Sequence, residues 1–377
     1  MNPRITMLKF LQKDKNFKCD TRFPRNVMHY RAMWSLCSNV QPSANAQSAH
    51  IPRSGTFRPT GESHFATANH IFSYFCTMKT SSNLVRDCRR HYASELENIY
   101  DSDEANALIM ILLEHYFNID RIKIAMEPDL RLSESEMLTL HFAVKELLKN
   151  KPVQYVIGET EFCGMRFFVD ENVLIPRPET EELVKAIARR DKACLVRTGY
   201  DVETDCRPSI IDIGTGSGCI AISIAKLLKN SVVTAVDVFE KALEVAKKNA
   251  EANDVDVQFV LDDILNPQNQ ELIDNQFDII VSNPPYVCES EKSEMRANVL
   301  DFEPSSALFV SDNDPLIFYR KILEFAQKSL KPNGEVWFEI NEKLGAEMKN
   351  LCLEKGFEKV EIIKDFRGKD RILRATK

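Results

Sequence analysis

The sequence predicts an α/β protein in which a small helical region precedes a mostly parallel sheet of seven strands. Two observations support this prediction: β-prone and helical segments alternate from residue 209 onward, and the last two strands flank a short turn. A third is a strand, beginning at Phe277, that two prolines stop abruptly. In open sheets of this kind, ligands bind at the carboxyl ends of the strands. The residues that follow these strands are therefore the candidates for a functional site.

The segments of the predicted sheet follow a polar link at 192–208. The predicted parallel strands are 209–213, 232–237, 257–261, the strand from Phe277, and 335–340. The predicted helices are 219–228, 241–252, 315–330 and 343–355. Segments 360–364 and 371–375 surround the turn 367–370 and predict an antiparallel hairpin that closes the sheet.

Residues 78–151 have a helical pattern and predict a small helical domain. Asp101-x-x-Glu104 and Ser133-x-x-Glu136 are spaced as capping boxes at the starts of helices. The apolar face that follows Ser133 consists of Met137, Leu140, Val144, Leu147 and Leu148. We expect this face to form the core of the domain.

Between the helical domain and the sheet, residues 152–176 are predicted to form a β-hairpin linker of short strands around Gly164. The next segment, Pro176-Arg177-Pro178-Glu179-Thr180-Glu181, ends an extended piece and opens a helix, because proline suits the first turn and glutamates complement the helix dipole. Simple capping and a part in the site remain equal alternatives for Arg177, Glu179 and Thr180.

The composition excludes several classes of protein. With 44% hydrophobic and 28% charged residues, the 377-residue chain has an ordinary globular composition, and no apolar run approaches the roughly 18 residues of a membrane span. The ten cysteines include no C-x-x-C pair, which favours unpaired thiols in a reducing compartment over a zinc ribbon. All seven histidines lie at or before His141, so the sheet region has no imidazole for a base or a metal, and we expect no metal site.

Residues 1–77 lack a sustained helical or strand period, and we expect little stable structure there. They contain ten Lys and Arg against three Asp and Glu, so the remaining 300 residues carry a net charge of −14. Three interpretations are open: an organellar presequence, a functional tail, or sequence upstream of the natural start at Met78. We favour the third. The acidic remainder does not indicate general affinity for nucleic acid.

The segment Asn283-Pro284-Pro285-Tyr286 ends the strand from Phe277 and predicts a site for a planar NH2 group. Proline at 284 restricts Asn283 to extended geometry, which stiffens it. The Asn283 side-chain oxygen and the Pro284 carbonyl are two acceptors, and an NH2 group has two hydrogens to donate. Held so, with its flat face against the ring of Tyr286, the nitrogen would be aimed at an electrophile, which is catalysis by positioning.

A glycine-rich turn, Gly214-Thr215-Gly216-Ser217-Gly218, joins the first strand of the sheet to its first helix. Its G-x-G-x-G spacing differs from the G-x-G-x-x-G of dinucleotide-binding proteins, which disfavours a nicotinamide-dependent oxidoreductase. Asp237 ends the next strand, where a carboxylate can accept hydrogen bonds from ribose hydroxyls. Asp263 and Ile264 follow the third strand and are placed to contact an adenine, although Asp263 could equally cap a loop.

These motifs together resemble the HemK-type peptide chain release factor glutamine methyltransferases over roughly residues 82–377. The resemblance implies S-adenosylmethionine as the methyl donor, a class I (Rossmann-like) methyltransferase domain at 177–377, and a helical domain that docks the protein substrate. It implies transfer to the glutamine nitrogen of the Gly-Gly-Gln motif of release factors. Where the family often has an aromatic residue, this chain has Ile264. The implied cofactor residues are Gly214, Thr215, Gly216, Ser217, Gly218, Asp237, Asp263, Ile264 and Asn283, and the implied catalytic residues are Asn283, Pro284, Pro285 and Tyr286.

Two alternatives to a release factor enzyme remain. A nucleic-acid amino methyltransferase would use the same Asn-Pro-Pro-Tyr chemistry on adenine or cytosine, and a non-catalytic nucleotide-binding module would bind the cofactor without turnover. We expect a cytoplasmic protein, or a mitochondrial one if residues 1–77 are a presequence. We expect no contact with membranes or nucleic acid. The oligomeric state stays open, with a monomer as the expectation.

Overall fold

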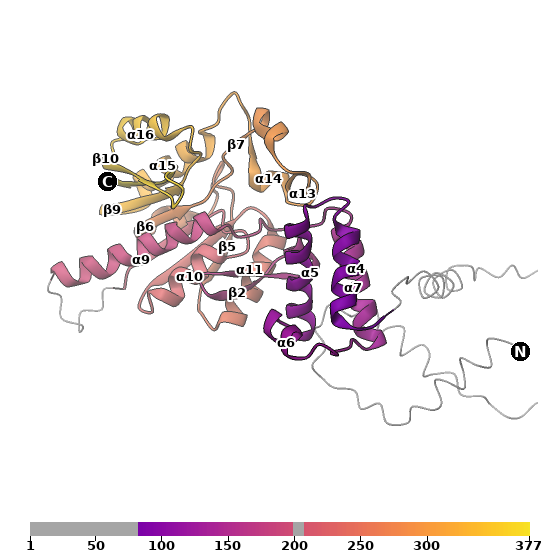
Figure 1. Ribbon diagram of the computed structural model, residues 1–377. Helices are drawn as coiled ribbons and strands as arrows, with labels where there is room; N and C mark the ends of the chain where they lie inside the picture. The colour runs from indigo at the N-terminus through magenta and orange to yellow at the C-terminus, as the bar shows by residue number, and fades with distance from the viewer. Residues whose placement is uncertain (1–81, 199–206) are drawn as a thin grey trace, which may run out of the picture. The chain divides into compact units, whose positions relative to one another are not determined.

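The computed structural model describes residues 82–198 and 207–377 (Figure 1). The expectations for residues 1–77 and for most of the polar link at 192–208 lie outside these residues or their described side chains. Within the described part of the chain, no helix is both long and apolar enough to cross a membrane.

The helical region predicted at 78–151 contains helices α4 (Val85–Leu96), α5 (Ser102–Phe117), α6 (Arg121–Met126) and α7 (Glu134–Leu147). Both predicted helix starts are capped: Asp101 accepts a hydrogen bond from the Glu104 N–H, and Ser133 and Glu136 form a reciprocal capping box. On α7, Leu140, Val144 and Leu147 are fully buried, and Met137 and Leu148 pack against the same cluster. The helices therefore have a hydrophobic core of their own.

The predicted linker differs from the structure in its first part. Residues Val153–Ile157 form a short helix, α8, rather than an extended strand. Pro152 lies at its start, and Gly158, with φ of 79°, ends it in the left-handed conformation that glycine adopts at little cost. The expected hairpin follows as β1 (Glu159–Phe162) and β2 (Met165–Phe168), which pair antiparallel.

Helix α9 (Pro178–Thr198) begins at the predicted proline but extends beyond residue 192, where we expected a polar link. No glycine or proline interrupts the chain between Pro178 and Gly199, so local sequence gives the helix no reason to stop earlier.

The sheet has the seven predicted strands, in the order β10-β11-β9-β6-β3-β4-β5. Strands β3 (Ser209–Ile213), β4 (Val232–Asp237), β5 (Gln258–Leu261), β6 (Phe277–Ser282) and β9 (Leu330–Glu339) are parallel. Strands β10 (Glu358–Lys364) and β11 (Asp370–Thr376) form the antiparallel hairpin, and β11 also pairs antiparallel with β9. The predicted mixed sheet is confirmed.

Helices cover both faces of this sheet (Figure 1). From Ile279 onward, successive residues of β6 point to opposite sides: Ile279 and Val281 join the cluster with α9, α10 (Cys219–Leu227) and α11 (Glu240–Asn253), while Ile280 joins the cluster with α15 (Ile317–Ser329) and α16 (Gly345–Glu354). Phe277 also belongs to the second cluster, and the register of β6 against β9 shifts between Phe277 and Ile279. Ile279, Ile280 and Val281 are buried on both faces of the sheet, which explains why these three consecutive residues are all apolar.

Small elements fill the connections after β5 and after β6. The first connection contains α12 (Gln270–Asp274). The second is an insertion, 287–310, with β7 (Val287–Cys288), the 3-10 helix η2 (Glu289–Glu294), α13 (Ala297–Leu300), α14 (Ser305–Leu308) and β8 (Phe309–Val310). Strands β7 and β8 pair in parallel, which closes the insertion on itself next to the carboxyl end of β6.

Asn249 on α11 fastens the hairpin to the glycine-rich turn. Its Oδ1 accepts from the Phe168 N–H over 2.6 Å, and its Nδ2 donates to the carbonyls of Phe168 and Ser217 over 3.0 and 2.9 Å. We expect Asn249→Ala to lower the free energy of unfolding by about 3 kcal/mol, because it leaves buried backbone groups without partners. Asn253→Ala, which removes two more exposed bonds one turn later, should cost less than about 1 kcal/mol. Urea unfolding measures both, and equal losses would contradict this role of Asn249.

Candidate active site

The predicted site residues meet at the carboxyl edge of the sheet. Because β3 pairs in parallel with both β4 and β6, the turns after these strands open on the same side. They surround a cavity of about 330 Å³. Of the predicted residues, those that line it are Gly214, Thr215, Gly216, Ser217, Asp237, Asp263, Ile264, Asn283, Pro284 and Pro285. Gly218 and Tyr286 are not among the lining residues.

The glycine-rich turn has backbone conformations that favour glycine. Gly214, Gly216 and Gly218 have φ of 75°, 55° and 80°. A Cβ on Gly214 or Gly216 would meet no atom within 4 Å, so the backbone at these two positions borders open space. At Gly218 a Cβ would lie 2.8 Å from Cδ1 of Ile222, so this glycine allows close packing at the start of α10 instead. The turn is therefore a cradle that a ligand can approach closely.

Asp237 lies at the end of β4 and is almost fully buried. Its Oδ2 accepts from the Gly216 N–H over 2.8 Å and its Oδ1 from the Phe239 N–H over 3.0 Å. Burial raises the pKa of Asp237, and these backbone hydrogen bonds oppose the rise. Each carboxylate oxygen has a second lone pair, so Asp237 can both shape the turn and accept from a ligand. The sequence predicted only the second of these roles.

Asp263 and Ile264 follow β5 and line the cavity. Strands β3 and β4 lie between β5 and β6, the strand that the Asn-Pro-Pro segment follows. Oδ1 of Asp263 accepts from the Leu265 N–H over 2.9 Å, so Asp263 caps the loop that follows β5. Ile264 packs partly against the core cluster of α15 and also lines the cavity. Both residues thus combine a structural contact with access to the cavity.

Asp212, inside β3, forms hydrogen bonds with the glycine-rich turn and with the start of α10. Its Oδ2 accepts from the Thr215 hydroxyl over 2.6 Å and from the Ala221 N–H over 3.2 Å. Burial raises the pKa of Asp212 to about 7, and the charge of Asp237 adds to the rise while the two hydrogen bonds oppose it. The turn is therefore held by a carboxylate that burial has made a weak acid.

Asn283 stands at the end of β6, where the strand is pinned by a hydrogen bond from the Ser282 hydroxyl to the Ile213 carbonyl of 2.6 Å. Its Nδ2 donates to Oγ1 of Thr180 over 3.3 Å. Tyr286 does not line the cavity, but its hydroxyl donates to Oε1 of Glu339 over 3.0 Å. The corner after β6 is thus fixed by side chains from α9 and β9.

The segment 176–181, whose role the sequence left open, takes part in the site. Arg177 lines the cavity and donates to Oε1 of the buried Glu303 over 2.5 Å, and Glu303 also accepts from the Ile175 N–H. Thr180 lines the cavity and donates to Oε2 of Glu339 over 2.6 Å. The sequence reasoning missed Glu303 and Glu339. A glutamate that ends the apolar strand Val336-Trp337-Phe338 was a signal that could have found the second.

The described residues contain no cluster of three or more His, Cys, Asp or Glu side chains that could hold a metal ion. The cysteines whose side chains are described, Cys88, Cys163, Cys219, Cys288 and Cys352, are all free thiols. The polar groups at the cavity are instead hydroxyls, amides and carboxylates. Such groups can hold a polar organic ligand and an NH2 group.

Both the helical region and the sheet region of this chain are similar in sequence to known proteins. Family models match residues 200–301 as a methyltransferase small domain and residues 87–158 as a PrmC N-terminal domain. The release factor glutamine methyltransferase of Flavobacterium psychrophilum is 43% identical over 293 residues, which are 78% of this chain and 99% of the relative. That of Bacteroides thetaiotaomicron is 44% identical over 75% of this chain and 96% of the relative. The chain belongs to the release factor glutamine methyltransferase family.

Membership in the release factor glutamine methyltransferase family confirms the resemblance, the fold class and the enzyme class predicted from the sequence. A solved structure from Alicyclobacillus acidocaldarius, described as a release factor-specific protein-(glutamine-N5) methyltransferase, is 28% identical. It covers 56% of this chain and 99% of its own, with a TM-score of 0.32. The assignment to the family rests on the sequence relatives.

The raised pKa of Asp212 predicts a pH-dependent difference in stability. The folded chain keeps the proton of Asp212 up to about pH 7, whereas the unfolded chain releases it near pH 3.9. Between these values the folded state binds more protons, so the Asp212 contribution to stability falls as pH rises and is constant above about pH 8. Relative to Asp212→Asn, the wild type should lose roughly 1 kcal/mol per pH unit between about pH 5 and 7. Urea unfolding of both proteins across pH 5 to 9 measures this, and a difference that stays constant would show that Asp212 titrates normally.

Proposed function

We propose that this chain transfers a methyl group from S-adenosylmethionine to the side-chain nitrogen of the glutamine in the Gly-Gly-Gln motif of peptide chain release factors. The observation that best supports this proposal is the shared cavity, which is lined both by the glycine-rich turn after β3 and by Asn283 and Pro284 after the neighbouring strand β6. The proposed donor site and the proposed NH2-binding site would thus share one cavity. Because release factors work where ribosomes are, the proposed compartment is the cytoplasm.

The residues around the turn fit an adenosine-containing cofactor. Gly214 and Gly216 leave open space where side chains would otherwise stand, which allows the backbone to contact a ligand. The Asp237 carboxylate at the end of β4 can accept from ribose hydroxyls, and Ile264 and Asp263 can border the adenine. Bound there, S-adenosylmethionine would supply a methyl group on a sulfonium centre. Ser217, Gly218 and Thr215 shape the turn that holds it.

The Asn-Pro-Pro-Tyr corner would bind the glutamine amide by its two hydrogens. Asn283 Oδ1 and the Pro284 carbonyl are the two acceptors, and Pro285 and Tyr286 keep the corner rigid beside them. An amide nitrogen is a poor nucleophile, and positive charge develops on it as it attacks a methyl carbon. Two fixed acceptors stabilise that charge more than they stabilise the neutral amide, which lowers the barrier.

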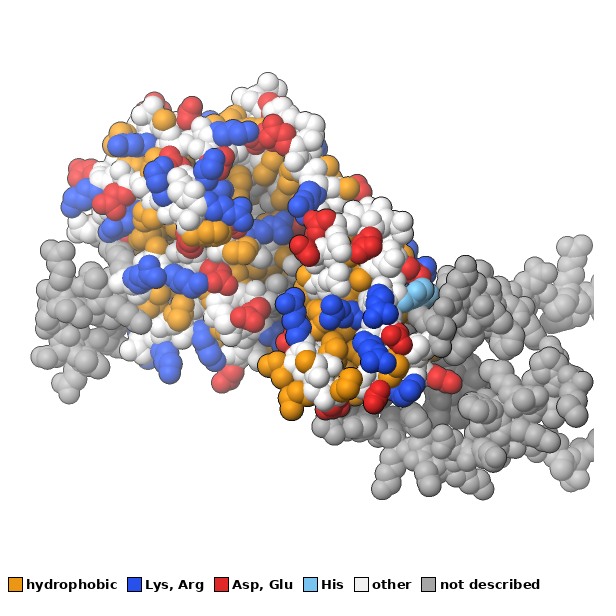
Figure 2. Space-filling model, viewed as in Figure 1, with side chains coloured by type: hydrophobic (Ala, Val, Ile, Leu, Met, Phe, Trp, Pro, Cys, Tyr) orange, Lys and Arg blue, Asp and Glu red, His pale blue; other side chains and the backbone are white. Residues whose placement is uncertain are grey.

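The charges on one face of the molecule favour a protein acceptor over a nucleic acid. On the face shown in Figure 2, basic and acidic side chains are interspersed rather than gathered into a basic field. The helical region at 87–158 has its own core and matches the PrmC N-terminal domain, which supports a role as a second surface for a folded substrate. We propose this region as the docking domain.

Replacement of Asn283 by alanine should reduce kcat for methylation of a release factor by at least about a hundredfold, because one of the two fixed acceptors is lost. The measurement is incorporation of labelled methyl from S-adenosylmethionine into purified release factor. Asn313→Ala, at an exposed asparagine in the insertion's flank, is the matched control and should keep normal activity.

The acceptor is tested in the same assay. A release factor whose Gly-Gly-Gln glutamine is replaced by alanine should take up no label, and DNA and RNA should take up none. Label in the alanine-substituted factor, or in nucleic acid alone, would overturn the proposed substrate.

Replacement of Gly216 by alanine tests the cofactor cradle. The methyl group would occupy space that the ligand needs, so we expect the Kd for S-adenosylmethionine to rise about tenfold or more, with a stability loss of about 1 kcal/mol from the left-handed backbone. Gly356→Ala is a matched control, because Gly356 has φ of 77° and open space around it but lies away from the cavity. Calorimetric titration measures both affinities. A Kd that rises equally in the two variants would contradict the cradle.

A further inference from the structure

A chain of hydrogen bonds links the Asn283 amide to a buried carboxylate on the neighbouring strand. Asn283 Nδ2 donates to Oγ1 of Thr180 over 3.3 Å, and the Thr180 hydroxyl donates to Oε2 of Glu339 over 2.6 Å. The other carboxylate oxygen, Oε1, accepts from the Tyr286 hydroxyl over 3.0 Å. Glu339 is 1% exposed and Thr180 is 2% exposed, so water does not compete for these bonds.

This chain of bonds decides which end of the Asn283 amide faces Thr180. An asparagine amide has nearly the same shape in both orientations, so packing alone does not choose between them. The Thr180 hydroxyl has one hydrogen, which it donates in the hydrogen bond to Glu339. Oγ1 of Thr180 can then only accept, and only the NH2 end of Asn283 can donate to it. Oδ1 of Asn283 is left as the acceptor that this cavity-lining side chain offers.

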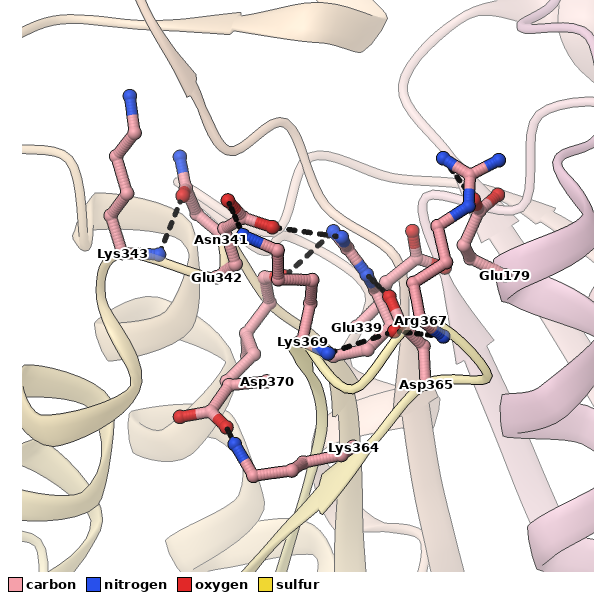
Figure 3. A network of polar contacts seen from close by, with 12 residues as sticks. Glu179, Glu339, Asn341, Glu342, Lys343, Lys364, Asp365, Arg367, Lys369 and Asp370 are labelled. Carbon is pink, nitrogen blue, oxygen red and sulfur yellow. Dashed lines mark hydrogen bonds and ion pairs between the residues drawn. The ribbon is translucent and has the colours of Figure 1, made fainter.

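The groups around Glu339 act on its pKa in opposite directions. Burial raises the pKa of Glu339, and the hydrogen bonds from Thr180 and Tyr286 together with the positive charge of Arg371 oppose the rise. Arg371 is held in turn by Asp365, 3.2 Å from its Nε, and by Glu342. Figure 3 shows Glu339 in the midst of this polar network, in which Asp365 and Glu342 lie nearby.

We propose that Thr180 and Glu339 are positioning residues, which fix the Asn283 amide with its oxygen toward the substrate's NH2 group and hold Tyr286 beside it. This inference rests on the proposed function, since an oriented acceptor matters only for a substrate that donates. Without the Thr180 hydroxyl, the amide is free to turn over. Its NH2 group would then face the substrate's NH2 group, where two donors meet and no hydrogen bond forms.

Variants at position 180 separate the hydroxyl from its shape. Thr180→Val keeps the shape and removes the hydroxyl, Thr180→Ser keeps the hydroxyl and removes the methyl, and Thr180→Ala differs from the serine variant by the hydroxyl alone. We expect kcat to fall about tenfold or more in the valine and alanine variants, roughly the loss of one hydrogen bond, and to stay within about threefold of wild type in the serine variant. The KM for the release factor and the Kd for S-adenosylmethionine should change less than about threefold in all three.

The outcomes are read against the melting temperature of each variant. Should valine at 180 prevent folding, the alanine and serine pair still decides, because both residues fit the first turn of α9. Equal kcat in the serine and alanine variants would overturn the proposal, and so would a loss confined to the Kd for S-adenosylmethionine. Failure of the proposed function would look different, because the wild-type protein itself would then leave the Gly-Gly-Gln glutamine unmethylated.

Discussion

The parallel pairing of β3 with β6 is the constraint on which the rest of the site depends. In this register Ile213 lies opposite Ser282, so Gly214 and Asn283 follow their strands side by side. The hydrogen bond from the Ser282 hydroxyl to the Ile213 carbonyl holds the two strand ends at this position. A slip of one residue would exchange the faces of β6 and bury the wrong side chains. The apolar core on both faces of the sheet therefore also fixes the distance between the cradle and the Asn-Pro-Pro corner.

Several buried carboxylates lie near this edge of the sheet, and each holds particular side chains by hydrogen bonds. Asp212 holds the glycine-rich turn, Glu303 holds Arg177 at the cavity wall, and Glu339 holds Thr180 and Tyr286. A buried carboxylate without partners costs several kcal/mol, so each of these makes its surroundings intolerant of movement. Rigidity of this kind is what catalysis by positioning requires, because the acceptors must already be in place when charge develops on the nitrogen.

The sequence was sufficient where local patterns decide the structure. Strands β3 and β4 have the predicted bounds, since β-branched runs ended by glycine or aspartate leave little choice. The glycine-rich turn and Asn283 were predicted as site residues, and the structure brings them to one cavity. Their chemical roles remain proposals. Helix α8 was missed because the five residues Val153–Ile157 are β-prone by composition. Pro152 at the start and Gly158 at the end instead bound a short helix.

Contacts between distant residues were beyond the reach of sequence patterns. Thr180 and Glu339 are 159 positions apart, and Arg177 and Glu303 are 126 positions apart, so no spacing rule could pair them. Tyr286 was predicted to pack on the substrate, whereas its hydroxyl contact with Glu339 depends on a residue of β9 that lies 53 positions further along the chain. These long-range hydrogen bonds fix the position of the Asn-Pro-Pro-Tyr segment.

A crystal structure of the protein with S-adenosylhomocysteine and a peptide that contains Gly-Gly-Gln tests the central claim most directly. The account predicts the glutamine nitrogen at hydrogen-bond distance, about 2.7–3.2 Å, from both Asn283 Oδ1 and the Pro284 carbonyl, with the sulfur on its open side. A glutamine nitrogen bound by other groups, or a peptide outside the cavity that Gly214 and Asn283 share, would contradict it.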